Sequence, residues 1–219
     1  MTEQLDWGAV LRLAEGEFLV RLARRAVEAY LAEGKQIKPP PDTPERLMEK
    51  RGVFVTINSF ENIEGKVYKR LRGCIGYPEP VAPLAEATID AAISSATRDP
   101  RFYPLTLKEL NNVVFEVSVL SPLELIKVSK PSDLPKKIKV GRDGLVVERG
   151  IFRGLLLPQV AVEWGWDEET FLCEACMKAG LFPDAWLLEG TKVYRFEAEI
   201  FEELEPGGKV IRKELTPHR

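Results

Sequence analysis

The sequence predicts an α+β fold: a mostly antiparallel sheet flanked by helices, with two subdomains within one domain. Three observations carry this prediction. Helical periodicity is confined to a few segments, the strands between them are short, and many strands are joined by turns that contain glycine or proline. Such turns favour hairpins, and hairpins build antiparallel sheets. The 219 residues suffice for one large domain or for one domain with an inserted lobe.

The first third of the chain predicts one helix followed by a pair of strands. Apolar residues recur at three- and four-residue steps over 6–33, which indicates an amphipathic helix, and Gly34 is a natural stop. The proline-rich segment 39–44 cannot continue a helix and predicts a stiff connection across the surface. The segments 52–59 and 67–77 are rich in β-branched residues and predict two antiparallel strands.

The remaining elements follow from the same two periodicities. Pro83 suits the start of a helix that runs to Thr97, and the segment 113–120 alternates cleanly, as a strand does. Further strands are expected at 123–128, 138–140, 145–148, 152–157 and 192–201, and further helices at 158–164 and 168–179.

The domain organisation predicted from these elements is simple. We expect a single domain over residues 1–204, with a smaller lobe formed by the hairpins within 113–157. Residues 205–219 have the composition of a polar C-terminal tail.

Composition and charge exclude several classes of protein. Apolar residues make up 45% of the chain and charged residues 30%, which is ordinary for a folded protein. The net charge of −3 argues against wholesale binding of nucleic acid or anionic lipid, both of which reward excess Lys and Arg. No export signal and no apolar run of roughly 20 residues occurs, so we expect a cytoplasmic protein without a membrane partner. Abundant Glu, Lys and Arg suit a thermophile.

The cysteines and the single histidine narrow the chemistry further. A low, odd number of cysteines, at positions 74, 173 and 176, fits a reducing compartment. His218 is the only histidine, so a Ser-His or Cys-His dyad in the body of the fold is excluded. The pair Cys173 and Cys176 has the C-x-x-C spacing but lies inside a predicted helix without a second ligand pair. We interpret both as buried small residues, and no metal site is expected.

The segment Leu71–Gly76 is the most unusual in the chain. Two glycines within four residues weaken a strand, which indicates a bulge or the close approach of a ligand or a second backbone. In a regular strand Arg72 and Cys74 would share a face, and the guanidinium would lower the pKa of the thiol. The functional interpretation is a reactive Cys74, and the alternative is a buried structural cysteine beside a bulge.

Two charged segments also admit two interpretations. The favoured interpretation of residues 98–102 is a local turn with an ion pair. The alternative is the rim of a site that binds an anion. The segment Lys127–Arg142 is a basic island, interpreted first as a solvated face and second as a nucleic-acid contact. Its cations are Lys127, Lys130, Lys136, Lys137, Lys139 and Arg142.

Seven segments taken together resemble the AMMECR-type domain family, over residues 8–204. They are Gly52–Thr56, Leu71–Gly76, Asp99–Phe102, Val117–Pro122, Leu155–Val160, Phe171–Leu172 and Cys176–Leu181. The resemblance implies an α+β domain with two subdomains and a biochemical function that is not settled. Family proposals place it near transcription, replication, repair or translation. Prokaryotic genes of the family often lie beside those for a radical-SAM protein and a Memo-type protein, which implies a shared modification pathway by analogy.

Two hypotheses about function follow. In the first, the protein is an enzyme or its substrate-handling partner, with a cleft around Leu71–Gly76 and Cys74 as nucleophile or ligand contact. The residues expected to bind the ligand, a small molecule or protein of unknown identity, are Arg72, Gly73, Gly76, Asp99, Arg101 and Gln159. In the second, it is a non-catalytic module that binds nucleic acid through Lys127–Arg142, or another protein. The sequence does not decide between enzyme and module, and it identifies no cofactor.

Overall fold

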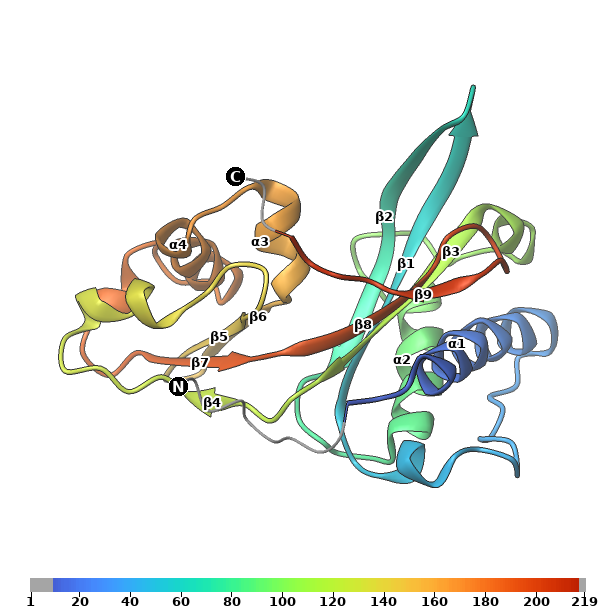
Figure 1. The fold of residues 1–219 in the computed structure, drawn as a ribbon, viewed down its shortest axis with the longest axis horizontal. Helices are drawn as coiled ribbons and strands as arrows, with labels where there is room; N and C mark the ends of the chain where they lie inside the picture. The colour runs from blue at the N-terminus through green and yellow to red at the C-terminus, as the bar shows by residue number, and fades with distance from the viewer. Residues whose placement is uncertain (1–9, 217–219) are drawn as a thin grey trace. The chain divides into compact units, whose positions relative to one another are not determined.

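A computed structural model describes residues 10–216, so the predicted helix start at Asp6 and the histidine His218 lie outside the described residues. The chain divides into two compact units. The first unit runs to Pro122 and takes in Glu199–Lys213, and the second consists of Leu123–Ala198 and continues from Glu214. Each unit has its own hydrophobic core. The predicted α+β class is confirmed (Figure 1).

The first unit is built on a five-stranded sheet in the order β2-β1-β3-β8-β9. Its strands are β1 (Gly52–Ile63), β2 (Lys66–Tyr77), β3 (Val113–Leu120), β8 (Ala198–Glu203) and β9 (Val210–Arg212). β1 pairs antiparallel with both β2 and β3, and β8 pairs antiparallel with β9. β1 therefore holds β2 and β3 in register on its two sides.

Two helices, α1 (Leu13–Glu33) and α2 (Leu84–Thr97), pack on this sheet and on each other. α2 covers β1 and β2, and α1 covers β3 and β9. Alternate side chains of the strands enter the core between the layers, such as Val55 and Ile57 on β1 and Val117 on β3. The predicted helix ends are confirmed: Gly34 adopts a left-handed φ of 70°, and Pro83 precedes the first turn of α2.

The start of α1 is fixed by a buried carboxylate that periodicity would place on the surface. The Glu15 carboxylate accepts a hydrogen bond from the backbone N–H of Arg12 at 2.6 Å and pairs with Arg46 at 3.2 Å. Only 2% of Glu15 is exposed. This capping arrangement starts the helix at Leu13, although the apolar pattern begins earlier.

The second unit is a four-stranded sheet in the order β4-β7-β5-β6 with two helices of its own. Its elements are β4 (Glu124–Leu125), β5 (Gly144–Arg149), β6 (Phe152–Leu156), α3 (Pro158–Trp164), α4 (Glu168–Lys178) and β7 (Lys192–Phe196). All neighbouring strands are antiparallel. The predicted cap of α4 is confirmed, because the Asp167 carboxylate accepts the N–H of Thr170 at 2.8 Å.

Short 3₁₀ turns complete the structure in both units. They are η1 (Glu45–Met48), η2 (Leu107–Asn112), η3 (Pro131–Asp133), η4 (Pro135–Lys137) and η5 (Ala185–Leu187). Within residues 10–216, no helix is both long and apolar enough to cross a membrane.

Three predicted strands are corrected by the structure. The single strand expected at 192–201 is β7 followed by β8, which belong to different sheets. Side chains alternate along a strand whichever sheet it joins, so the sequence pattern does not mark the change. Residues 138–140 form no strand, because the carboxylate of Asp143 accepts the N–H of Lys139 at 2.8 Å and closes a local turn. The strand expected at 123–128 is reduced to the two residues of β4.

The predicted subdivision also differs from the structure. The smaller lobe was expected within 113–157, but β3 belongs to the first unit, and the second unit extends beyond 157. The polar tail expected at 205–219 contains β9, which adds an edge to the first sheet. β9 has only three residues, too few to show the alternation that identifies a strand.

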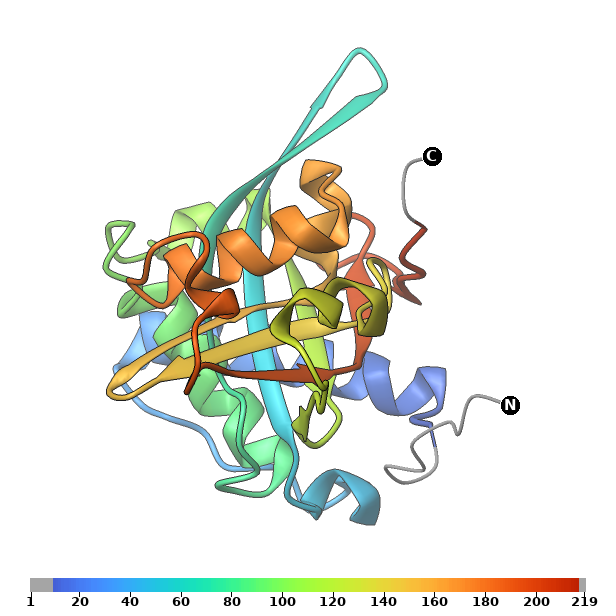
Figure 2. The same cartoon turned by 90° about the vertical axis from the view of Figure 1, so that its left-hand side faces the viewer.

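The β1–β2 hairpin continues beyond the sheet as a two-stranded arm (Figures 1 and 2). Its turn is Glu64–Gly65, with positive φ values of 51° and 82°, as a tight hairpin turn requires. At the base of this hairpin, where α2 covers β2, lies the segment Leu71–Gly76.

Candidate functional site

Both glycines of Leu71–Gly76 are explained by close backbone packing. A Cβ at Gly73 would lie 2.0 Å from the carbonyl oxygen of Ser95 on α2, and one at Gly76 would lie 2.2 Å from that of Val53 on β1. The Ser95 hydroxyl accepts the N–H of Ile75 at 2.8 Å and donates to the carbonyl of Val55 at 2.7 Å. The helix is thus bonded directly to both strands, and the sequence-based expectation of a second backbone in close approach is confirmed.

Arg72 occupies a bulge, and this overturns its predicted relation to Cys74. β1 and β2 are in register at Ile57 and Gly73 but shift at Asn58 and Leu71, which leaves Arg72 as the extra residue. The regular alternation that would place Arg72 and Cys74 on one face is therefore broken.

The guanidinium of Arg72 instead holds the loop after α2. It donates to the carboxylate of Glu109 at 3.1 Å and to the carbonyl of Tyr103 at 2.8 Å. Its predicted role as an activator of the thiol is wrong, and its observed role is to position this loop.

Cys74 lies in a row of polar side chains that crosses three strands. Thr56 on β1 is the direct cross-strand partner of both Cys74 on β2 and Glu116 on β3, so the three side chains share one face of the sheet. The Thr56 hydroxyl donates to the Cys74 sulfur at 3.4 Å. Glu116 is 3% exposed, and its carboxylate accepts from the ammonium of Lys213 at 2.9 Å.

The backbone of Cys74 is held from the open edge of β2 by a carboxylate and a guanidinium. The Asp99 carboxylate accepts the N–H of Cys74 at 2.9 Å, and Arg101 donates to the Cys74 carbonyl at 3.4 Å. Arg101 also donates to both oxygens of Asp99, at 2.9 and 2.7 Å. Although burial alone would raise it, these hydrogen bonds lower the pKa of Asp99 to about 2. Of the two interpretations of this segment, the local ion pair is confirmed.

The thiol of Cys74 is not activated in this arrangement. Burial raises its pKa, and the negative charge of Glu116 raises it further, while the hydrogen bond from Thr56 opposes both. The side chain is half-buried. The resting state at neutral pH is therefore a protonated thiol that can offer a polarizable sulfur and a weak donor to a ligand.

The other sequence-predicted residues lie in the second unit. Gln159 is buried in the first turn of α3. Cys176 on α4 is fully buried, which raises its pKa to about 11, and Cys173 is half-buried. Within the part of the chain that the structure describes, no group of three His, Cys, Asp or Glu side chains could hold a metal ion.

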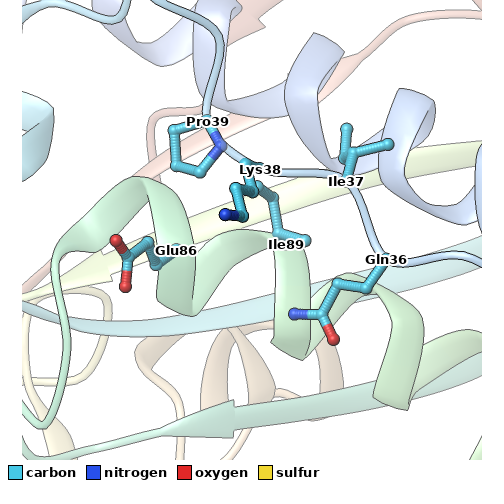
Figure 3. A pocket seen from close by; sticks show the side chains of 6 residues that line it. All are labelled: Gln36, Ile37, Lys38, Pro39, Glu86 and Ile89. Carbon is cyan, nitrogen blue, oxygen red and sulfur yellow. The ribbon is translucent and has the colours of Figure 1, made fainter.

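An open groove of about 440 Å³ in the first unit contains none of the predicted site residues. It lies between the extended segment after α1 and the exposed side of α2 (Figure 3). Its lining residues are Gln36, Ile37, Lys38, Pro39, Glu86 and Ile89.

Sequence reasoning missed the partners of Cys74 on the neighbouring strands. Thr56 carries no distinguishing signal, because a threonine on a strand is ordinary. Glu116 could have been found, since it is the only charged residue in the strand Val113–Leu120, whose other residues are apolar except for Ser118. Lys213 lies in the segment predicted as a tail, where a lysine is unremarkable.

The fold and site define a two-unit α+β protein with a half-buried thiol on the edge strand of a helix-covered sheet. The AMMECR1 family profile matches residues 20–201, and the chain belongs to the AMMECR1 family. A protein from Pyrococcus abyssi is 64% identical over 201 residues, covering 92% of this chain and 96% of that protein. One from Methanocaldococcus jannaschii is 57% identical over 206 residues, covering 94% and 98%.

A solved structure gives the same fold. The crystal structure of an uncharacterized protein from Pyrococcus horikoshii matches with a TM-score of 0.89 at 62% identity, covering 94% of this chain and 99% of that chain. The predicted family is confirmed. The cytoplasmic location and the thermophilic character stay predictions.

Proposed function

We propose that Leu71–Gly76 is the centre of a ligand-binding or catalytic site, with the protonated Cys74 thiol as the group that contacts the ligand. The observation that carries this proposal is the polar surroundings of one cysteine. Thr56 and Glu116 lie in a row beside the thiol, and Asp99 and Arg101 hold its backbone. A cysteine that only fills space behaves as a small apolar residue and requires none of these partners.

Arg101 supplies the cation of the proposed site. Its side chain is 45% exposed, and the guanidinium stacks on the ring of Phe102 at 5.4 Å. Nε and one terminal nitrogen bind Asp99, whereas the other, Nη1, has no hydrogen-bond partner among residues 10–216. An anionic group of a ligand can therefore be bound beside the thiol by a guanidinium that is already oriented.

In our proposal, three of the predicted ligand-binding residues maintain the structure of the site and do not contact the ligand. They are Arg72, Gly73 and Gly76. The two glycines allow α2 and β1 to approach β2, and Arg72 positions the loop that carries Asp99 and Arg101. Gln159 lies in the second unit, and its ligand-binding role stays a prediction from the sequence.

The family resemblance suggests the biological setting of the site. We place the protein in a modification pathway with a radical-SAM protein and a Memo-type protein, an inference by analogy from gene neighbourhood. The site would then hold or process the small molecule or protein that the pathway modifies.

A non-catalytic module that binds nucleic acid or protein is the second candidate. Its support is the exposure of Lys127, Lys130, Lys137 and Lys139. Two further cations of the island are engaged within the chain, because Lys136 pairs with Asp133 and Arg142 with Asp143. Binding of an oligonucleotide that weakens steeply with added salt would support this candidate, and no binding at low salt would leave only a protein partner.

Alkylation by iodoacetamide, quantified on the Cys74 peptide, tests the first candidate. We expect Cys74 to react in the folded protein, while the buried Cys176 reacts only after denaturation. Glu116→Gln should accelerate the reaction at pH 8, because it removes a negative charge that disfavours the thiolate. Glu202→Gln on β8 is the matched control and should change little. A Cys74 that reacts no faster than Cys176 in the folded protein would show that the cysteine is structural.

A further inference from the structure

A second groove, of about 370 Å³, lies wholly within the second unit. It opens where the short strand β4 ends beside β7 and where the loop from η5 returns to the sheet. Its lining is mostly apolar, with two lysines and one glutamate. The lining residues that matter here are Ile126, Lys127, Trp186, Glu189, Lys192 and Val193.

The walls of this groove are held by hydrogen bonds within the chain. The N–H of Ile126 donates to the carbonyl of Val193 at 2.9 Å, which joins one wall to the sheet. Arg149 donates to the carbonyl of Glu189 at 2.6 Å and to the hydroxyl of Thr191 at 3.0 Å, which fixes the other wall. The backbone of both walls is therefore fixed within the chain, and binding requires the movement of lining side chains only.

One residue of the lining, Trp186, carries a buried donor without an acceptor. Trp186 is 5% exposed, and its Nε1–H has no hydrogen-bond partner among the described residues. A buried donor in this state is costly, and such groups are rare in folded proteins. The nitrogen is shielded from solvent, so an acceptor that reaches it must displace lining side chains and becomes desolvated itself. A hydrogen bond formed there is strengthened by the low local dielectric constant.

The rim of the groove carries a cation without an ion pair. Lys127 is exposed, and no carboxylate in the described part of the chain pairs with its ammonium. Lys192 lies 3.7 Å from Glu148, so its charge is partly offset. The exposed cation of Lys127 and the unpartnered donor of Trp186 both favour a ligand that carries negative charge and acceptor atoms.

We propose that this groove binds a small ligand with an apolar body and an anionic head, such as a carboxylate or sulfonate. The head accepts from the Nε1–H of Trp186 and lies near Lys127, while the body contacts the apolar lining. The volume suits a ring system or a short acyl chain. This site is separate from the one around Cys74 and does not depend on its function. It gives part of the basic island Lys127–Arg142 a role other than nucleic-acid binding.

The test uses the dye 8-anilinonaphthalene-1-sulfonate, which has an apolar body and an anionic head. We expect saturable binding at one site, seen as increased dye fluorescence, and displacement by decanoate but not by the uncharged decanol. Trp186→Phe should weaken binding on the order of tenfold, because it removes the donor and keeps an aromatic ring. Lys127→Gln should weaken it by about threefold, because a charge at the rim is partly screened. Trp164→Phe, outside the groove, is the matched control and should leave binding unchanged.

Three results would overturn the proposal. One is the absence of saturable dye binding to the full chain. Another is a Trp186→Phe variant that keeps its native circular dichroism spectrum and binds the dye as tightly as the wild type. The third is displacement of the dye by a single-stranded oligonucleotide in preference to decanoate, which would assign this face to nucleic acid.

Discussion

Asp99→Asn should destabilise the protein by an amount that depends on pH. Asp99 is 4% exposed, and its carboxylate accepts hydrogen bonds from the backbone of Cys74 and from Arg101. An asparagine keeps the size of the side chain but replaces one acceptor oxygen by an NH₂ donor. That donor would face the N–H of Cys74 or the guanidinium of Arg101, both of which are donors.

The magnitude follows from the pKa of Asp99, which falls from 3.8 to about 2 in the folded protein. A depressed folded-state pKa stabilises the protein above the unfolded-state value, and this contribution is lost as the pH falls through the folded-state value. The difference corresponds to about 2 kcal/mol of unfolding free energy. This is an upper limit, because Arg101 is nearly half exposed and solvent screens its charge.

Urea unfolding of the wild type and the Asp99→Asn variant at several pH values measures this effect. We expect the wild type to be more stable at pH 7, by up to about 2 kcal/mol. The difference should shrink as the pH falls from about 4 towards 2, because the wild-type carboxylate then becomes protonated. Equal stability at pH 7, or a difference that does not change with pH, would refute the proposed electrostatic role of Asp99.

Two glycine substitutions test the close packing of the first unit by thermal unfolding. Gly73→Ala should lower the free energy of unfolding by more than about 3 kcal/mol, because its Cβ would lie 2.0 Å from the backbone oxygen of Ser95 and α2 must move. An unchanged melting temperature would contradict the packing explanation. Gly16→Ala should also destabilise the protein, by about 1 to 2 kcal/mol. The new Cβ would overlap the ring of Phe201, and the free-energy cost of this overpacking exceeds the roughly 1 kcal/mol by which alanine stabilises a helix relative to glycine. A more stable variant would show that the ring can move aside.

The parts of the fold that follow from local rules could be predicted from the sequence. Gly34, Pro83 and Asp167 mark helix ends through backbone conformation and capping, which depend only on neighbouring residues. The strand 113–120 was predicted with the bounds that the structure has, because alternation persists over its whole length.

The parts that depend on distant residues could not be predicted. The division of 192–201 into β7 and β8 is set by the two sheets that these strands join, and neither sheet is visible in the local pattern. The same holds for the candidate site. The sequence identified Cys74 but assigned its electrostatic partner to Arg72, the nearest cation along the chain. The bulge between the strands removes that partner, and the cation near Cys74 is Arg101 from the loop after α2.

The pH dependence of Cys74 alkylation tests the central claim most directly. The account predicts that the thiol reacts in the folded protein with an apparent pKa above the usual value of about 8.5, because burial and Glu116 both disfavour the thiolate. An apparent pKa well below 8.5 would contradict the protonated resting state and would restore an activated nucleophile. A thiol that reacts only after denaturation would contradict the site itself and would leave Cys74 as a packing residue.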